Sequence, residues 1–418
     1  MKGIWFQRPV LGWAAYDWAN SAFSLSVVTA FVPVLLSEYW NEGADSTVTT
    51  FRLGLANGVA SLLIAVTAPL LGAIADLAGR RKALLFLFAG LGIVMTGSLY
   101  FVAAGQWLLG VVCYVFASVG FASSNSLYDG LMVHVAPASH YDRVSAYGYA
   151  LGYLGGALLF SVNVVMVANP NLFGLASEVE AIRIAFLMVA VWWFVFSMPL
   201  LFWVKEFGDN RVGKPLSESF RQLITTIKVI VRQPDVMTFL VAYWLYIDGV
   251  FTIIKMAVDY GLSQGLSMQD LILAILITNF VGFPAALAFG RIGLQIGAKS
   301  GLVIALVIYI IVTFAAAFIT TSAEFFVLAI CIGLVQGGVQ SLSRSFFARL
   351  IPRRQSAEYF GFFNMIGKFS AVLGPILTGV VALSFGSQRI GILSILILFL
   401  AGLFFLLKVQ QPSTEGEA

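Results

Sequence analysis

Ionisable and amide side chains occur at helical spacing inside several apolar stretches of this chain. In AYDWANSAFSLS, residues 15–26, the side chains of Asp17, Asn20 and Ser24 share one face, because successive side chains of an α-helix advance by about 100°. A charged group at the centre of a bilayer costs at least about 2.5 to 3.5 kcal/mol, too much to retain against lipid. This polar face therefore predicts a hydrated path that binds a polar solute or carries protons.

Four further apolar stretches carry polar side chains. Asn125 and Asp129 share a face of one stretch, and Asp248, Thr252 and Lys255 share a face of another. With the first face they predict a set of solute-cavity or coupling residues drawn from five helices: Asp17, Asn20, Ser24, Asn125, Asp248, Thr252, Lys255, Gln336, Gln340, Asn364 and Lys368.

The charged members of this set have structural alternatives. Asp248 either faces the cavity, where it could couple solute movement to protons, or forms a buried structural pair. Lys255 lies four residues before Asp259 and could bind it on the same helix face. Lys368 either lines the cavity or binds an acid on the first or seventh helix. The spacing alone leaves these readings open.

Three other positions are equally open. Asp17 lies close to the start of its helix and could serve the helix end instead of a solute. Arg344 either gates the cytoplasmic side or extends its guanidinium to the membrane surface from two turns inside its helix. Gln336 and Gln340 could form interhelical hydrogen bonds, which average about 0.6 kcal/mol in membranes.

The composition says which elements hold these residues. Of 418 residues, 60% are hydrophobic and 11% charged, and the mean hydropathy is +0.94; a soluble domain has about 25% charged residues. Crossing a bilayer takes roughly 20 apolar residues, and such runs recur along the chain. They predict an integral, multi-pass, all-α membrane protein with helices near 12–36, 52–75, 83–104, 107–133, 144–168, 181–204, 236–259, 269–291, 300–320, 325–349, 359–384 and 389–408.

These twelve helices divide into two sets of six. Residues 1–204 form the predicted N-terminal bundle and residues 236–418 the C-terminal bundle. The polar segment 205–235 between them is a predicted cytoplasmic linker, part of it an amphipathic surface helix around 216–231. With the N-terminus inside, 19 of the 24 Lys and Arg residues fall in cytoplasmic positions, which predicts that both termini lie in the cytoplasm.

A weak internal repeat supports the two halves. GAIADLAGRRKALL follows the second predicted helix and GRIGLQIGAKSGLV follows the eighth. An offset of 218 residues aligns Gly72 with Gly290, Gly79 with Gly297 and Arg81 with Lys299. The first copy alone carries an acid, because Asp76 aligns with Leu294.

The segment GAIADLAGRR resembles the loop signature between the second and third helices of the major facilitator superfamily, although Leu77 stands where a basic residue is expected. The resemblance implies the major facilitator fold and a latch that joins the halves in the outward-facing state, with Asp129 placed to bind Arg80. The alternative is a positive cytoplasmic loop without a gating role. The implied gating residues are Gly72, Asp76, Gly79, Arg80, Arg81 and Asp129, and Arg344 is added to them for its position about two turns from the cytoplasmic end of its helix.

Four other segments narrow the resemblance: YDWANSAF, GYALGYLGG, GLVQGGVQSLSRSFFARLIP and GKFSAVLGP. Together they resemble the bacterial relatives of the autophagy-related vacuolar amino-acid effluxers. Two positions depart from known patterns. Asp129 stands where this branch is expected to have an asparagine, and Tyr153 stands where the drug/proton antiporter signature has a proline.

We therefore expect a secondary transporter that moves a small polar solute, amino-acid-like or a small organic ion, by alternating access, with or without proton coupling. The chain has no G-x-x-x-x-G-K-[ST] loop for nucleotides. The alternatives are a multidrug or lipid-like exporter of the same fold and a non-transporting solute sensor. An intramembrane enzyme would need a catalytic pair, for which His134, His140 and Asp142 are the candidates.

The expected partners are a small-molecule substrate, the lipid bilayer and, with proton coupling, protons. Neither a nucleic acid nor a cofactor is expected, because the basic residues are dispersed in short loops. Cys113 and Cys331 lie within apolar helices, which favours packing thiols over a disulfide or a metal site. The expected form is a monomer in the bacterial inner (plasma) membrane.

Overall fold

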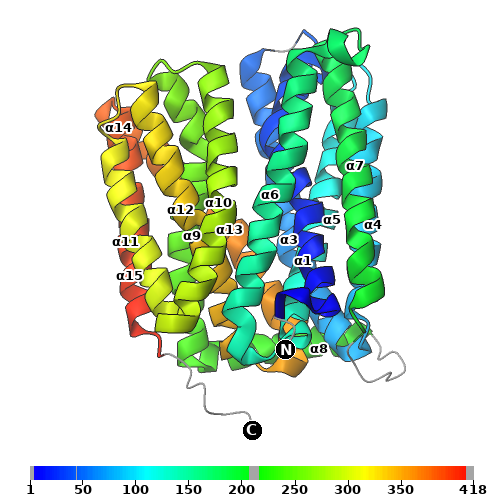
Figure 1. Cartoon of the computed structure of the whole chain (residues 1–418), viewed down its shortest axis with the longest axis vertical. Helices are drawn as coiled ribbons and strands as arrows, with labels where there is room; N and C mark the ends of the chain where they lie inside the picture. Colours follow the sequence, from blue (N-terminus) through cyan, green and yellow to red (C-terminus); the bar gives the residue numbers. More distant parts are fainter. Residues whose placement is uncertain (1–3, 44, 207–215, 411–418) are drawn as a thin grey trace.

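The computed structural model describes residues 4–43, 45–206 and 216–410, and these are almost entirely helical (Figure 1). Twelve helices in this part of the chain are long and apolar enough to cross a membrane. The predicted all-α class and the number of membrane spans are confirmed.

The first six spans make up the N-terminal half. The first span combines α1 (Arg8–Ala22), η2 (Phe23–Phe31), α2 (Val32–Leu35) and η3 (Leu36–Trp40). The next five spans and the short helices around them are α3 (Ser46–Ala78), α4 (Arg81–Ser98), α5 (Trp107–Val135), α6 (Tyr141–Ala168) and α7 (Glu178–Trp203), with η1 (Ile4–Phe6), η4 (Leu99–Phe101), η5 (Ala138–His140) and η6 (Pro170–Phe173).

The last six spans make up the C-terminal half, and α8 (Leu216–Arg232) precedes them within the predicted linker. The elements of this half are α9 (Pro234–Ser263), α10 (Met268–Ile296), α11 (Ala298–Ala316), α12 (Ser322–Leu350), η7 (Arg353–Gln355), α13 (Ser356–Phe385), α14 (Gln388–Leu393) and α15 (Ile395–Lys408).

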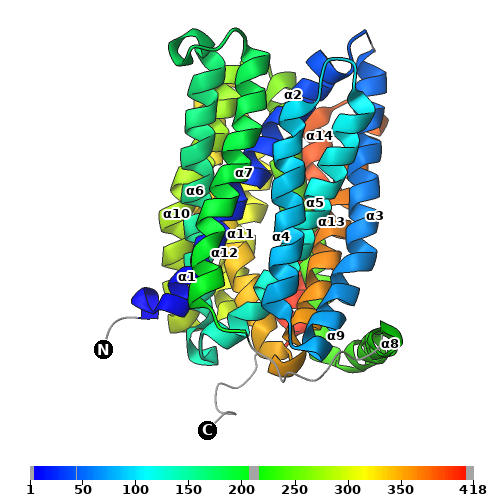
Figure 2. The same cartoon turned by 90° about the vertical axis from the view of Figure 1, so that its right-hand side faces the viewer.

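The two halves stand side by side, with α6 packed against α10 and α3 packed against α13 (Figures 1 and 2). Helix α1 begins and α15 ends at the same end of the bundle, at the bottom of both views, where α8 also lies. We call this the terminal end. The orientation of this end toward the cytoplasm stays a prediction.

In each half, the repeated loop places a glycine with positive φ at the end of a helix. Gly79 after α3 has φ 63° and ψ 27°, and Gly297 after α10 has φ 85° and ψ 148°, two conformations that glycine adopts without steric cost. Lys82 then donates to the carbonyl oxygens of Leu201 and Val204, at 3.0 and 2.8 Å, where α7 ends. The ammonium group of Lys82 thus satisfies carbonyls that no helical N–H reaches.

Lys299 does the same in the second half. Its Nζ donates to the carbonyl oxygens of Leu407 and Val409, both at 2.8 Å, where α15 ends. The structure therefore pairs Lys299 with Lys82, one residue away from the predicted alignment with Arg81. The cause is a loop one residue shorter, because α11 begins directly after Gly297 whereas α4 begins two residues after Gly79.

The opposite end repeats as well. Arg183, near the start of α7, donates to the carbonyl of Tyr100 at 2.8 Å, and Arg389, in α14, donates to the carbonyl of Ile319 at 2.9 Å. In each half an arginine at the beginning of the sixth span thus binds the end of the third. Each guanidinium group therefore links the third and sixth spans of its own half.

The first span changes helix type along its length. Residues Arg8–Ala22 are α-helical and residues Phe23–Phe31 are π-helical, with wider i→i+5 turns. The side chains of Asp17 and Asn20 are buried, whereas Ser24 is exposed. The prediction that Ser24 shares a face with the other two assumed one α-helical period, which ends at Ala22.

Candidate functional site

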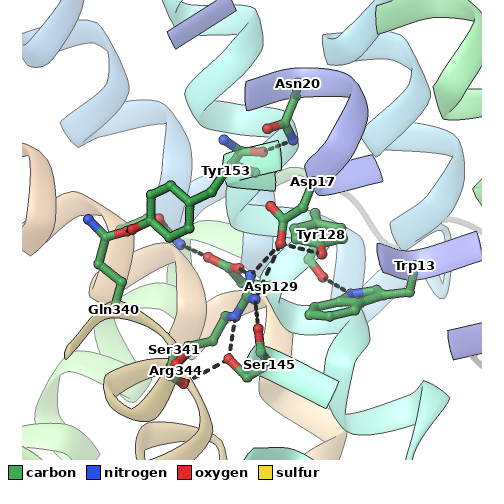
Figure 3. Close-up of polar contacts among 12 residues, drawn as sticks. Trp13, Asp17, Asn20, Tyr128, Asp129, Ser145, Tyr153, Gln340, Ser341 and Arg344 are labelled. Atoms are coloured by element: carbon green, nitrogen blue, oxygen red, sulfur yellow. Dashed lines mark hydrogen bonds and ion pairs between the residues drawn. The ribbon is translucent and has the colours of Figure 1, made fainter. Parts of the chain in front are cut away.

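A buried cluster of charges lies between the halves, centred on Arg344 of α12 (Figure 3). Arg344 is only 1% exposed, and its Nη1 lies 2.9 Å from Oδ1 of Asp129 in α5. Its Nη2 lies 3.3 Å from Oδ2 of Asp17 in α1. One guanidinium group therefore binds carboxylates from two helices of the other half. Of the two alternatives for Arg344, extension of its guanidinium to the membrane surface is therefore wrong.

Helix α6 adds neutral acceptors to the same guanidinium. Nε of Arg344 donates to the hydroxyl of Ser145 at 2.9 Å, and Nη2 donates to the carbonyl oxygen of Ser145, also at 2.9 Å. At Gly148, one turn further along α6, a Cβ would lie 2.5 Å from Oδ2 of Asp17. A glycine at this position lets α6 approach the cluster closely enough for Ser145 to bind.

Aromatic and amide groups complete the surroundings of the two carboxylates. Tyr128 donates its hydroxyl to Oδ2 of Asp17 at 2.8 Å, and Asn364 of α13 donates to Oδ2 of Asp129 at 2.9 Å. The guanidinium also lies over the ring of Tyr149, 4.2 Å from its centroid. Buried charges are tolerated only when they are paired and hydrogen-bonded, and this cluster meets both conditions.

A second ion pair joins the halves nearer the terminal end. Arg349 of α12 binds both oxygens of Asp142 in α6, each at 2.8 Å, in the bidentate arrangement that suits a guanidinium and a carboxylate. Ser345 donates to the same Asp142 at 2.5 Å. Arg353 donates to the carbonyl oxygen of Val133 at 2.7 Å. Positive groups of the C-terminal half thus bind oxygens of the N-terminal half again.

The residues of the repeated loop form a third contact between the halves. Oδ1 of Asp76 lies 2.5 Å from Nε of Arg81, and Oδ2 accepts from the backbone N–H of Glu358 at 2.9 Å, in the first turn of α13. Arg81 donates to the carbonyl oxygen of Arg354 at 2.9 Å. A Cβ at Gly72 would collide with the carbonyl group of Ala357. The structure therefore brings Gly72, Asp76 and Arg81 together across the boundary.

Two of the predicted gating residues take other positions. Arg80 is exposed, and Asp129 binds Arg344 and Asn364 instead of the predicted Arg80. Gly79 has the terminating role at the end of α3 described above. A guanidinium from the opposite half thus takes the place of the loop arginine, because Asp129 faces the boundary and Arg80 faces outward.

Other predicted cavity residues are joined in pairs. Asn20 donates to the side-chain oxygen of Asn125 at 2.7 Å, which links α1 to α5. Tyr153 of α6 donates to the side-chain oxygen of Gln340 in α12 at 3.0 Å, which links the halves, while Gln336 one turn earlier is half-buried. The amides therefore face neighbouring helices of the bundle interior.

Asp248 accepts hydrogen bonds from the backbone of a neighbouring helix. Its two carboxylate oxygens each accept from the N–H of Gly374 at 3.0 Å, and Thr252 donates to Oδ1 at 3.5 Å. Gly374 directly precedes Pro375, which lies inside α13 and has no N–H to donate. Asp248 is 1% exposed. It joins α9 to α13 within the C-terminal half.

The two lysines of the predicted set lie near this position. Nζ of Lys368 lies 5.7 Å from the ring centroid of Phe121 in α5, so the C-terminal half presents a cation to the N-terminal half here. Lys255 is exposed and interacts electrostatically with both Asp248 and Lys368. The structure thus gathers Asp248, Lys255 and Lys368 in one region.

Several boundary residues were not assigned to the predicted site. Ser145 and Tyr128 lie among apolar residues, and no pattern within their own helices distinguishes them from packing residues. Arg349 is recognisable in the sequence only as a positive residue near a helix end. Asp142 was considered only as part of a catalytic pair with histidine, but it binds Arg349. The sequence feature that could have identified Asp142 and Arg349 is an acidic or basic residue close to the end of an apolar stretch.

Comparison with known proteins gives the family. The family model described as "Vacuole effluxer Atg22 like" matches residues 43–137 and 133–418. The chain is 34% identical over 414 residues to the uncharacterised MFS-type transporter YxiO of Bacillus subtilis, covering 98% of this chain and 97% of that protein. It is 28% identical to autophagy-related protein 22 of Yarrowia lipolytica over 66% of this chain, which spans about half (52%) of that protein.

A solved structure supports the fold. The proton:xylose symporter XylE, of the major facilitator superfamily, superposes with a TM-score of 0.74 over 97% of this chain and 95% of its own, at 14% identity. At this identity the likeness shows the fold alone. The family and the fold identify a multi-pass membrane transporter of a small-molecule substrate and not an enzyme. The chain belongs to the Atg22-like family of vacuole effluxer relatives and has the major facilitator fold.

Proposed function

We propose that this protein is a secondary active transporter that moves a small polar solute by alternating access, and that the buried Arg344 cluster is its gate. The observation that carries this proposal is one guanidinium group that binds α1, α5 and α6 across the boundary between the halves. In the predicted orientation the terminal end is cytoplasmic, in a bacterial inner membrane. The described arrangement is then closed toward the cytoplasm.

The position of the contacts between the halves supports a gate. Asp76 with the first turn of α13, Asp142 with Arg349, and Arg353 with the end of α5 all lie toward the terminal end. Alternating access works by rocking one bundle against the other around a central site. These contacts would break together when the terminal end opens.

The substrate class is proposed from the cationic region near the middle of the bundle. Lys255 interacts electrostatically with Asp248, and Lys368 lies close enough to Lys255 for the two positive charges to repel each other. Two ammonium groups beside one carboxylate, with the amides of Asn20 and Asn125 on the facing helices, suit an amino-acid-like or small anionic solute. The similarity to vacuole effluxers is consistent with this class.

The Arg344 cluster also offers a place for a coupling proton. It holds two carboxylates, Asp17 and Asp129, against one guanidinium group. When the halves separate, the carboxylates lose that guanidinium, and a buried unpaired charge is costly. A proton taken up at this moment would neutralise one carboxylate. Asp248 is a weaker candidate because the N–H of Gly374 already holds both of its oxygens.

Proteoliposomes test both parts of this function. Purified protein is first screened by thermal shift against leucine, glutamate and arginine, and the stabilising compound is then used as the radiolabelled probe. We expect wild type to show counterflow and uptake driven by a pH gradient. Asp129→Asn should keep counterflow and lose the driven uptake, because the amide cannot carry the proton.

The exposed acid Glu42 supplies the control, and Glu42→Gln should behave like wild type. Driven uptake that survives in Asp129→Asn would rule out coupling at this carboxylate. Absence of counterflow with every stabilising compound would contradict the transporter itself.

A further inference from the structure

Helix α8 contacts the bundle through one of its faces. Thr226 and Ile230 are buried, at 2% and 5% exposure, and Gln222 donates to a carboxylate oxygen of Glu358 at 3.4 Å. The helix packs on α3 and α9. At 100° per residue, these three side chains cover a sector of about 80°.

The next face of α8 is apolar and uncovered. Ile224, Ile227 and Val231 are 55%, 43% and 61% exposed. Their spacing of three and four residues places them within about 60° of one another, and the centre of this face lies about 130° from the centre of the face that touches the bundle. Exposed apolar side chains gathered on one helix face mark a contact with a protein or with a membrane.

A third face is basic. Arg221, Lys228 and Arg232 are all exposed and fall within about 40° of one another. The centre of this stripe lies about 90° from that of the apolar face and about 140° from that of the bundle contact. Around the helix the order is therefore bundle contact, apolar face and basic stripe.

This order matches a helix that lies in the plane of a membrane surface. An interfacial helix buries its apolar face about 5 to 10 Å into the boundary of headgroups and acyl chains, with Lys and Arg beside that face. Helix α8 lies where α3 ends at Ala78 and α9 begins at Pro234, so it is located at an end of the membrane spans. An apolar face there meets acyl chains.

We propose that α8 is a binding site for anionic phospholipid. Ile224, Ile227 and Val231 insert among the acyl chains, and Arg221, Lys228 and Arg232 bind the headgroup phosphates. Charge complementarity selects the occupant, because the stripe carries three positive side chains and no acid in the described residues 221–232. A zwitterionic lipid satisfies the apolar face equally well but gains less from the stripe.

The location of α8 adds a reason for such a site. Gln222 binds Glu358, and the backbone N–H of Glu358 is bound by Asp76. A lipid held by α8 is therefore two hydrogen bonds away from the contact between α3 and α13. The site lies beside the boundary between the halves without being part of it.

Titration of the full-length protein with phosphatidylglycerol, followed by native mass spectrometry, tests the site, with phosphatidylcholine as the second arm. Each basic side chain near an anionic surface is worth roughly a fivefold gain in affinity. We expect wild type to prefer phosphatidylglycerol, and the variant Arg221→Gln/Lys228→Gln/Arg232→Gln to bind it at least about tenfold more weakly. Its binding of phosphatidylcholine should be unchanged.

A matched control removes the same charge elsewhere. Arg8, Lys205 and Arg291 are exposed basic residues outside α8, and Arg8→Gln/Lys205→Gln/Arg291→Gln should bind phosphatidylglycerol like wild type. Arg221→Lys/Arg232→Lys keeps the charge and should also retain the preference.

Two results would overturn the proposal. One is equal weakening of phosphatidylglycerol binding in the control and in the α8 variant, which would indicate a general effect of net charge. The other is wild type that does not distinguish the two lipids, as expected if a protein covers this face instead.

Discussion

Lys82 and Lys299 bind the end of the last helix of their own halves through pairs of carbonyl oxygens, and Arg183 and Arg389 each bind one carbonyl oxygen at the end of the third span. The contacts inside each half thus repeat. Across the boundary, by contrast, the N-terminal half supplies the carboxylates Asp17, Asp129 and Asp142, and the C-terminal half supplies the guanidinium groups of Arg344 and Arg349.

The difference shows which contacts can be alike in the two halves and which cannot. Carbonyl oxygens at a helix end need a hydrogen-bond donor in both halves. Both halves therefore have a lysine at this position, although the loops differ in length. A boundary between two halves needs complementary partners, and these cannot be identical. Asp76 and its counterpart Leu294 show the divergence within one repeated loop, because only the acid receives backbone N–H groups of the other half. Each of the following variants separates the two kinds of contact.

Loss of the central guanidinium should have the largest effect. Arg344→Leu leaves Asp17 and Asp129 buried without their cation, and breaking a buried pair in this way costs about 3 to 5 kcal/mol. We expect a correspondingly lower unfolding free energy in detergent, measured by denaturant titration. Arg344→Lys keeps the charge and should lose less. A stability equal to wild type in Arg344→Leu would contradict the assigned pairing.

Crowding of the boundary should have the next largest effect. In Gly72→Ala the new methyl group meets the backbone of Ala357, which cannot rotate away, and such overpacking costs about 1 to 3 kcal/mol. The terminal end should open more often. Maleimide labelling of Ser356→Cys, in a background without Cys113 and Cys331, reports this opening.

Gly90→Ala is the matched control, because a Cβ at Gly90 meets nothing within 4 Å. Labelling that rises equally in Gly72→Ala and Gly90→Ala would show that helix propensity, and not contact between the halves, is responsible.

The outer ion pair should contribute a smaller coupling. A double-mutant cycle with Asp142→Asn and Arg349→Gln isolates the interaction of these two side chains. Arg349 is partly exposed, with 14% of its side chain accessible, so we expect a coupling energy of about 1 to 2 kcal/mol in unfolding experiments. Additive effects of the two substitutions would show that the pair contributes nothing.

Substitution of the repeated lysines should have the smallest effect on stability, and the effect should be similar in the two halves. Lys82→Met and Lys299→Met each remove two hydrogen bonds to carbonyl oxygens, and we expect each to cost about 1 kcal/mol. Labelling of Ser356→Cys should stay at the wild-type rate in both. A large difference between the two variants, or faster labelling in either, would contradict their shared role inside a half.

The sequence was sufficient for much of the fold. Apolar length predicted twelve spans, and helical spacing placed Asp17 and Asn20 on one face of the first span, where both are buried. These features depend on one helix or one loop at a time. The π-helical turn after Ala22, which moved Ser24 off the expected face, depends on packing that local composition does not encode.

The candidate gate was less predictable. That Arg344 contacts Asp129, rather than the membrane surface, depends on how α12 is rotated against α5 and α6. The partners Ser145 and Asp142 are marked by no spacing within their own helix. Asp248 binding the N–H of Gly374 depends on the contact between α9 and α13. Such pairings depend on how helices pack against one another, which the pattern within a single helix does not encode.

The geometry around Arg344 has a consequence for how the halves separate. Its guanidinium group binds α1, α5 and α6 simultaneously. A small movement that separates it from one of these helices therefore leaves the charge buried without all of its hydrogen-bond partners. Such a position is less favourable than either full engagement or full hydration. We therefore expect opening to be cooperative, with two populated positions and a barrier between them, rather than a gradual widening.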